Sequence, residues 1–223
     1  MTQAKSFAPT ERTTPTRSRE RASYDEATVH AILDEGYVCH LGFVRDGAPV
    51  VLPTLYGRVG DRLYLHGSTG SRPLRMAGGT AETDPGLAVC VTVTHVDGLV
   101  LAKSAFHHSI NYRSVVVHGI AHQVIDEDEK TAALDALVEH VVPGRTADSR
   151  PANAKELAAT AVIRLDLREV SAKIRTGGPN EEPEDLALPY WTGVLPVSPV
   201  YGAPIPADDL APGTPEPAYL SAR

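Results

Sequence analysis

The sequence predicts a mainly β protein of the α+β class, an antiparallel barrel of six to seven strands with peripheral helices. Extended runs fill much of residues 37–125, and the dipeptides Asp46-Gly47, Gly60-Asp61 and Asp97-Gly98 interrupt them as tight turns. Hairpins join antiparallel neighbours, whereas parallel strands need long crossover connections. The pattern therefore favours an antiparallel meander closed into a small barrel.

The first helix is expected to follow Ser23, because Ser23 and Glu26 have the spacing of a capping box, and to end at Gly36. The second is expected at 127–141, after the capping residue Asp126. A further short helix is expected in the loop that follows.

The predicted strands share a two-residue alternation of apolar and polar side chains, or a short apolar run between turn signals. They are residues 37–44, 48–59, 63–66, 87–96, 99–104, 112–125 and 161–175. Asp46-Gly47 is expected to join the first strand to the second, Gly60-Asp61 the second to the third, and Asp97-Gly98 the fourth to the fifth.

Composition divides the chain into three parts. Residues 1–22 lack periodicity and predict a disordered N-terminal arm. Residues 23–179 form the predicted barrel domain. Residues 180–223 are rich in proline and predict an extended tail, in which the segment 190–197 holds the only Trp and is expected to dock.

The overall composition is that of an ordinary globular protein, with 42% hydrophobic and 22% charged residues. The net charge of −7 leaves no basic face, so a nucleic-acid partner is not expected. No signal-peptide pattern follows Met1, and no apolar run approaches the roughly 20 residues of a membrane span. Cys39 and Cys90 lack CxxC spacing and are expected to be buried, reduced thiols. We therefore expect a cytoplasmic protein without membrane contact.

The segment 64–76 passes from a strand through Gly, Ser and Thr residues into a short helix with Pro73 in its first turn. Unpaired N–H groups at the start of a helix suit an anion such as a phosphate. Neighbouring hydroxyl groups add donors, and Arg72 or Arg75 supplies positive charge. The alternative is a capped surface helix with solvated arginines.

Six motifs, in this order along residues 24–197, resemble one known family. They are Y-V-C-H-L-G-F at Tyr37, V-V-L-P-T at Val50, L-Y-L-H-G-S-T-G-S-R at Leu63, N-Y-R-S-V-V-V-H-G at Asn111, S-A-K-I-R at Ser171 and W-T-G-V-L-P at Trp191. The family is that of the pyridoxamine 5′-phosphate oxidase-like proteins, which are FMN-binding split β-barrels. Within it, the branch of Nim-type nitroimidazole-resistance proteins looks closest.

This resemblance implies a homodimer that holds FMN in a groove between two barrels. The residues implied to line the isoalloxazine ring, mostly through their backbone, are Val51, Leu52, Pro53 and Thr54. Those implied for the ribityl chain and the phosphate are His66, Gly67, Ser68, Ser71 and Arg72. Ser114 is implied to approach the flavin from the partner subunit.

Two departures from the family pattern bear on the ligands. Arg72-Pro73 stands where pyridoxamine phosphate oxidases commonly have Arg-Lys, which removes one cation unless Arg75 replaces it. Ser114 and Val116 stand where those enzymes have Gln and Arg. The loss of that Arg argues against a pyridoxal-type phosphate substrate.

His66 is the candidate catalytic residue, because a histidine beside a cofactor groove can hydrogen-bond the flavin or relay a proton. The alternative is a histidine that only caps the loop. Trp191 and Lys173 are candidates for the substrate pocket, with Trp191 as a lid over the partner's flavin. Their alternatives are a packing anchor for the tail and a solvated strand end.

Four further histidines, His107, His108, His118 and His122, raise the question of a metal or a haem. No cysteine or carboxylate completes a recognisable ligand set, so no metal site is expected. Haem stays open as an alternative because some split-barrel relatives handle haem.

We expect an FMN-dependent oxidoreductase that reduces a small electrophile such as a nitroaromatic compound. No GxGxxG or Walker loop is present, so NAD(P)H as electron donor would bind only transiently. Three alternatives stay open: a non-catalytic flavin-binding or flavin-buffering protein, a haem-binding relative, and a reductase that uses a deazaflavin.

Overall fold

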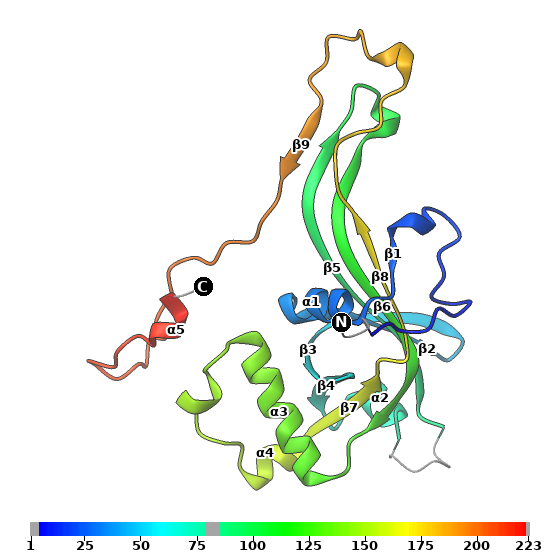
Figure 1. Cartoon of the computed structure of the whole chain (residues 1–223). Coiled ribbons are helices and arrows are strands. Elements are labelled where there is room, and N and C mark those ends of the chain that lie inside the picture. Colours follow the sequence, from blue (N-terminus) through cyan, green and yellow to red (C-terminus); the bar gives the residue numbers. More distant parts are fainter. Residues whose placement is uncertain (1–4, 79–84, 222–223) are drawn as a thin grey trace.

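Six antiparallel strands pair in a closed ring, which is the barrel of the computed structural model (Figure 1). The structure describes residues 5–78 and 85–221. Around the ring the strands are β2 (Val38–Arg45), β3 (Ala48–Val59), β4 (Arg62–Ser68), β7 (Thr160–Asp166), β6 (Ser109–Gln123) and β5 (Leu87–Leu101), which returns to β2. The predicted fold class, an antiparallel barrel with peripheral helices, is confirmed.

Three further strands extend the sheet beyond the ring. β1 (Ala22–Ser23) pairs with β8 (Glu169–Arg175), and β8 pairs with the first half of β6. β5 and β6 continue past the ring as a long two-stranded arm, and β9 (Gly193–Pro196) pairs with the outer part of β5 (Figure 1).

Two tight turns were predicted correctly. Asp46 and Gly47, with φ of 51° and 78°, join β2 to β3, and Gly60, with φ of 56°, joins β3 to β4. Both φ values of the first turn lie in the left-handed region that a two-residue hairpin requires.

The predicted hairpin at Asp97-Gly98 is wrong. β5 runs straight through these residues with a shift of register between Val96 and Gly98, and the carboxylate of Asp97 accepts hydrogen bonds from Arg113 on β6. A bulge uses a glycine as readily as a turn does, so the dipeptide alone cannot separate the two. The true turn between β5 and β6 contains the 3₁₀ helix η2 (Ala105–His107).

The predicted strand 161–175 is also wrong, because it is two strands. The chain turns at Leu167 and Arg168, where the N–H of Leu167 donates to the carbonyl of Asp61. β7 then follows β4 and the end of β6, whereas β8 follows the first half of β6. The apolar alternation continues through the turn and therefore conceals it.

Five α-helices lie outside the sheet in the described residues. They are α1 (Glu26–Glu35), α2 (Arg72–Met76), α3 (Glu127–Val141), α4 (Ala154–Ala159) and α5 (Ala218–Ser221), with the 3₁₀ helices η1 (Arg19–Arg21), η3 (Thr146–Asp148) and η4 (Pro183–Asp185). The bounds of α3 and its cap, Asp126, are as predicted. The cap of α1 is Asp25, not Ser23, because Ser23 is part of β1 and the Asp25 carboxylate accepts from the N–H of Thr28.

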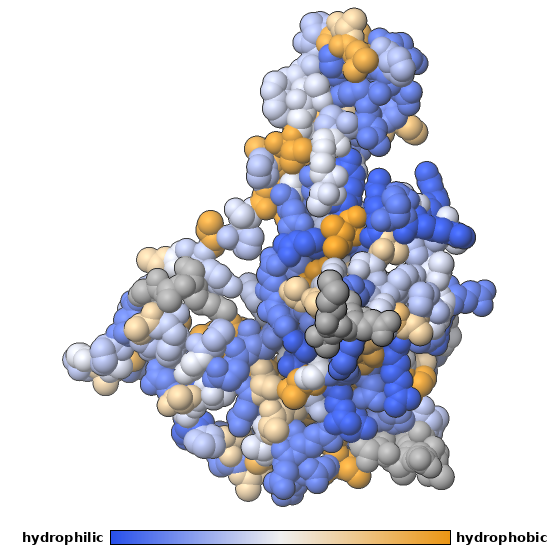
Figure 2. Space-filling model, viewed as in Figure 1, coloured by the Kyte–Doolittle hydropathy of each residue, from blue (hydrophilic) through white to orange (hydrophobic). Residues whose placement is uncertain are grey.

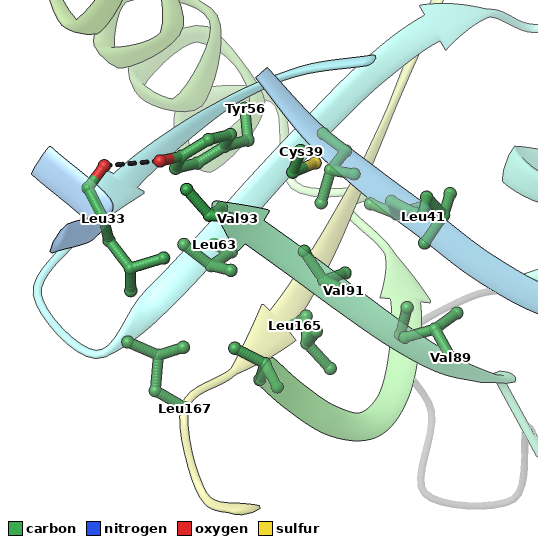
Figure 3. Packing of buried hydrophobic residues seen from close by; sticks show 14 of the residues in the cluster. Leu33, Cys39, Leu41, Tyr56, Leu63, Val89, Val91, Val93, Leu165 and Leu167 are labelled. Atoms are coloured by element: carbon green, nitrogen blue, oxygen red, sulfur yellow. Dashed lines mark hydrogen bonds between the residues drawn. The ribbon is translucent and has the colours of Figure 1, made fainter. Parts of the chain in front are cut away.

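The core fills the barrel (Figure 3), and Val29, Ile32 and Leu33 of α1 are part of it. The Tyr56 hydroxyl donates to the Leu33 carbonyl at 2.5 Å within this core. Cys39 is buried there, and desolvation raises the pKa of its thiol to about 12. Cys90 is only partly buried.

The described part of the N-terminal segment, residues 5–22, contacts the domain. Arg12 forms an ion pair with Glu169, and the Tyr24 hydroxyl donates to the carbonyl of Thr13, which is buried. At the other end Tyr219 on α5 donates to Asp148. Residues 1–4 of the predicted arm and 222–223 of the predicted tail lie outside the described residues.

Within the described ranges, no helix combines the length and the apolar character that crossing a bilayer requires.

Candidate functional site

The residues implied for the flavin ring lie where β3 has a partner on one edge only. On that edge, residues 48–55 pair with β2. On the other edge, β3 pairs with β4 only from Tyr56 to Val59. Beyond Leu65, β4 continues beside β7 alone. Within residues 5–78 and 85–221, the second edge of 51–54 therefore has no strand partner, and we call this place the split.

The side chains of this stretch alternate between two faces. Leu52 lies opposite the core residue Leu41 on β2, whereas Val51 lies opposite Gly42 on the outer face. Val51 is 62% exposed and Leu52 39%. Because the backbone groups on the second edge are unpaired, they can hydrogen-bond the polar edge of a planar ligand.

His66 projects from β4 at the split. Leu63 and Leu65 fill the barrel, so Tyr64, His66 and Ser68 face outward. Burial lowers the pKa of His66 below its ordinary value of 6.5, which keeps the ring neutral near pH 7. Its Nδ1 is buried without a hydrogen-bond partner among the described residues. Such an atom costs about 1–3 kcal/mol, which a polar ligand atom would offset.

The end of β4 turns tightly into α2. The N–H of Ser71 donates to the carbonyl of Ser68 at 2.8 Å, and the Ser68 hydroxyl accepts from Gly70. Ser71 caps α2 without a side-chain hydrogen bond, so its hydroxyl is available to a ligand. Gly67 points inward, where an added Cβ would lie 2.7 Å from Leu74 on α2, which gives it a packing role.

Three arginines line one surface pocket beside this turn. The pocket is lined by Arg72, Arg75 and Met76 of α2, by Arg45 at the end of β2 and by Asp46 in the β2–β3 turn. Arg45 lies 3.8 Å from Asp46, whereas Arg72 and Arg75 form no ion pair within the described ranges. A five-residue helix adds little dipole, so the net charge of the arginines is the main attraction for an anion. This arrangement favours the anion site over solvated arginines.

Sequence reasoning missed Arg45. It lies far from α2 in the sequence, and the only available signal was its position next to the predicted Asp46-Gly47 turn.

Ser114 and Lys173 lie together, but not at the split of their own chain. The Ser114 hydroxyl donates to the Lys173 carbonyl at 3.3 Å, and Lys173 Nζ donates to the carbonyl of Arg17 at 3.4 Å. Around the ring, β5 and β2 on one side and β7 and β4 on the other separate β6, which carries Ser114 and pairs with β8, from β3. Either residue would need a second copy of the chain to reach the flavin ring, as the resemblance implies for Ser114.

Trp191 comes two residues before β9, which pairs with the outer part of β5, away from the ring (Figure 1). Its indole packs over Gly193, where an added Cβ would lie 2.9 Å from the ring, and it is 68% exposed. Gly193 pairs with Leu101 near the outer end of β5. Within one chain Trp191 therefore does not lie beside His66.

The four histidines considered for a metal or a haem fall into two groups. His118 and His122 both lie on the outward face of β6, as their spacing suggests. His107 and His108 lie at the tip of the arm, where His107 Nε2 is 3.6 Å from Glu182 and His108 Nδ1 is 3.1 Å from the carbonyl of Ser104.

One group of possible metal ligands occurs in the part of the chain that the structure describes. Glu26 and His30 on α1 and Asp61 in the β3–β4 turn have donor atoms within 4.8 Å of one another. His30 Nε2 and Asp61 share a hydrogen bond of 3.0 Å. That bond ties α1 to the turn and accounts for the group as a structural contact.

Comparisons with known proteins agree with this geometry. The sequence matches the family described as pyridoxamine 5′-phosphate oxidase over residues 25–174. The flavocytochrome Anf3 from Azotobacter vinelandii is 38% identical, with a TM-score of 0.88 over 97% of this chain and 98% of that one. The FAD and haem binding protein from Mycobacterium smegmatis is 39% identical, with a TM-score of 0.84 over 91% and 96%.

A protein described as a 5-nitroimidazole antibiotic resistance protein from Bacteroides thetaiotaomicron is 21% identical, with a TM-score of 0.55 over 69% and 86%, and shares the fold. No curated protein matches the chain. From the match over residues 25–174 and the 38% and 39% identities over most of the sequence, we conclude that this chain belongs to the pyridoxamine 5′-phosphate oxidase family of split-barrel proteins.

Proposed function

We propose that this protein binds a flavin nucleotide at the split and acts, as a homodimer, as an oxidoreductase on a small electrophile. One observation carries the proposal. The unpaired edge at 51–54, the unpartnered Nδ1 of His66 and the arginine pocket follow one another through the split and the turn from β4 into α2. These features match the ring, the chain and the phosphate of a flavin nucleotide.

The nucleotide is either FMN or FAD. The sequence resemblance implies FMN, whereas the relative from Mycobacterium smegmatis is described as an FAD and haem binding protein. The pocket of Arg45, Arg72 and Arg75 suits the terminal phosphate of FMN and the diphosphate of FAD. The bound flavin would supply the redox chemistry. The protein orients the ring through the β3 backbone, and neutral His66 is available to hydrogen-bond it or to accept a proton.

A second copy of the chain completes the site in this proposal. Apolar side chains on the outer face of β2 and β3, with the residue before β2, are between 37% and 62% exposed, and they are Tyr37, Val38, Val44, Val51 and Leu55. Contiguous exposed apolar surface marks an interaction site. The partner subunit would contribute Ser114, with Trp191 and Lys173 toward the substrate.

The test is the absorbance spectrum of the purified protein, before and after incubation with FMN and with FAD, and the mass of any extracted flavin. A yellow protein that oxidises NADH or NADPH and reduces a nitroimidazole under anaerobic conditions supports the full proposal. A yellow protein without turnover supports the non-catalytic flavin-binding alternative. Binding of a deazaflavin in place of both flavins supports the deazaflavin alternative. A protein that stays colourless with both flavins overturns the proposal.

A second candidate function, haem binding in addition to flavin binding, is favoured by the two relatives of 38% and 39% identity. One relative is described as a flavocytochrome and the other as an FAD and haem binding protein. The two matches cover 97% and 91% of this chain. Coverage this high includes part of the tail beyond residue 174. A Soret band on titration with haemin supports this candidate, and its absence overturns it.

A further inference from the structure

Arg175, the last residue of β8, holds a buried positive charge without a carboxylate partner among the described residues. It is 8% exposed. Its Nη1 donates to the side-chain oxygen of Asn111 at 2.5 Å and to the carbonyl of Gly177 at 3.5 Å, and its Nη2 donates to the carbonyl of Gly178 at 3.2 Å. All of these acceptors are neutral. Because a buried charge is costly unless an opposite charge offsets it, this environment favours an anion beside the guanidinium.

The guanidinium of Arg175 has donors left for such an anion. Arginine carries five N–H donors, and the three hydrogen bonds to Asn111, Gly177 and Gly178 use three of them. Within the described ranges, Nε–H and one N–H of Nη2 have no acceptor. Neighbouring N–H groups of a planar guanidinium suit the two oxygens of a carboxylate.

A small polar pocket of about 270 Å³ lies at this guanidinium. One wall belongs to the short helix η1 of the N-terminal segment, which β1 joins to β8 (Figure 1). The other walls come from the end of β8 and the chain that follows it. The lining residues are Glu20, Arg21, Ile174, Arg175, Thr176, Gly178 and Asn180.

The charged side chains of the pocket sum to one positive charge. Arg21 and Arg175 line it together with Glu20, whose side chain is 72% exposed and lies 3.6 Å from Arg21 Nε. Arg17 and Arg19, which are exposed on the same segment, add positive charge outside the pocket. Figure 2 shows strongly hydrophilic residues on this part of the surface, beside the position of β1 and β8 in Figure 1. In a protein of net charge −7, such a place favours a small monoanion.

The pocket lies next to the residues that the proposed dimer brings to the partner's flavin. Ser114 on β6 lies opposite Lys173 on β8. Tyr112, two residues earlier on β6, lies opposite Arg175. Arg175 is therefore one outward-facing position beyond Lys173, about 7 Å along the strand. A small molecule at Ser114 can reach the pocket with its far end.

We propose that this pocket binds the carboxylate of the substrate, so that the small electrophile is a monoanion. The inference rests on the proposed function, because only the proposed dimer brings the pocket toward a flavin. Arg21 and Arg175 are then specificity-determining residues. They hold the carboxylate equally before and during the reaction, and the chemistry takes place elsewhere on the substrate.

The experiment compares 4-nitrobenzoate with 4-nitrobenzamide, which has the same nitroaromatic ring but a neutral amide in place of the carboxylate. Isothermal titration calorimetry of the full-length protein, without an electron donor, measures both dissociation constants in the absence of turnover. The wild type should bind 4-nitrobenzoate at least tenfold more tightly than 4-nitrobenzamide. Added salt should reduce this preference, because it screens the arginines.

Arg21→Gln and Arg175→Gln each remove one cation of the pocket. Arg19→Gln is the matched control, since Arg19 lies on the same short helix but is not among the lining residues. Each pocket variant should weaken binding of 4-nitrobenzoate by about 10- to 100-fold and leave 4-nitrobenzamide unchanged, whereas Arg19→Gln should match the wild type. In turnover with NADH or NADPH, the change should appear in KM for 4-nitrobenzoate and not in kcat.

The outcomes separate this inference from the proposed function. Equal affinity of the wild type for both compounds, in a yellow and active protein, overturns the inference alone. A preference for 4-nitrobenzoate that persists in Arg21→Gln and Arg175→Gln overturns the assignment to this pocket, and Arg21→Gln decides the matter if Arg175→Gln does not fold. Tighter binding of 4-nitrophenyl phosphate than of 4-nitrobenzoate overturns the carboxylate. A protein that stays colourless with both flavins overturns the proposed function and with it the assignment of the anion to a substrate.

Discussion

Tyr56 on β3 and Leu65 on β4 are the last residues that pair before the two strands separate at the split. Both belong to the buried core. The hydroxyl of Tyr56 also donates to the carbonyl of Leu33, which closes the C-terminal half of α1 onto the barrel (Figure 3). The split, where we place the candidate flavin site, therefore begins directly beside Tyr56, a residue that is held in the core by its packing and by its hydrogen bond to Leu33.

Replacing Tyr56 with Phe should lower the free energy of unfolding by about 1–3 kcal/mol, because the carbonyl of Leu33 stays buried without its donor. Urea unfolding measures the change. The control is Tyr190→Phe, since Tyr190 is 62% exposed and should lose almost nothing. Equal stabilities for the two variants would contradict the role of the Tyr56 hydroxyl.

Gly57 allows α3 to approach β3 closely. A Cβ at this position would lie 3.1 Å from both the Cα and the N of Leu137, which are backbone atoms of the helix. Gly57→Ala should therefore push α3 away and cost about 1–3 kcal/mol, as other overpacked sites do. Gly178→Ala is the matched control, because nothing lies within 4 Å of its added Cβ. The measurement is the thermal unfolding midpoint of each variant, which should fall for Gly57→Ala and stay at the wild-type value for Gly178→Ala.

Local signals were enough for the hairpin turns and for α3. The turns at Asp46-Gly47 and Gly60-Asp61 were predicted correctly because Asp46, Gly47 and Gly60 adopt positive φ, and the cap Asp126 because its carboxylate accepts from the start of the helix. Asp97-Gly98 has the same local chemistry as the first two. Here, however, the chain continues as a strand, and the Asp97 carboxylate pairs with Arg113 on β6. A local sequence pattern cannot reveal a partner on another strand.

In the candidate site, too, the features set by local sequence were predicted and those set by distant contacts were not. The loop from His66 to Arg72 was found because its composition is distinctive, and the resemblance supplied the residues of β3. Arg45 was missed because only the folded β2–β3 turn brings it to the pocket of Arg75. The split itself depends on where pairing between β3 and β4 stops, which the apolar alternation does not encode.

Burial of His66 predicts a pH dependence of stability. Its pKa in the folded state is below the ordinary value of 6.5, so between these two values the unfolded chain binds more protons than the folded chain. The free energy of unfolding should therefore fall as the pH falls through this interval. His66→Asn should lose less stability than the wild type over the same interval, in urea unfolding at a series of pH values. An NMR titration that placed the His66 pKa above 6.5 would falsify the prediction.

The arginine pocket predicts that affinity depends on the phosphate of the flavin. Arg72→Ala should raise the dissociation constant for FMN by about 10- to 100-fold, since a hydrogen bond to a charged group contributes about 1.5–3 kcal/mol. The same variant should bind riboflavin as the wild type does, because riboflavin has no phosphate. Quenching of flavin fluorescence measures both constants.

Arg168→Ala is the control for general charge, because the Arg168 side chain is 85% exposed and pairs only with Asp166 among the described residues. It should leave both constants unchanged at moderate salt. Comparing Arg45→Ala with FMN and with FAD then separates the two nucleotides. If Arg45 serves the diphosphate, its loss weakens FAD more than FMN. Equal loss of FMN and riboflavin in Arg72→Ala would instead mean that the arginine supports the fold of the turn and not the phosphate.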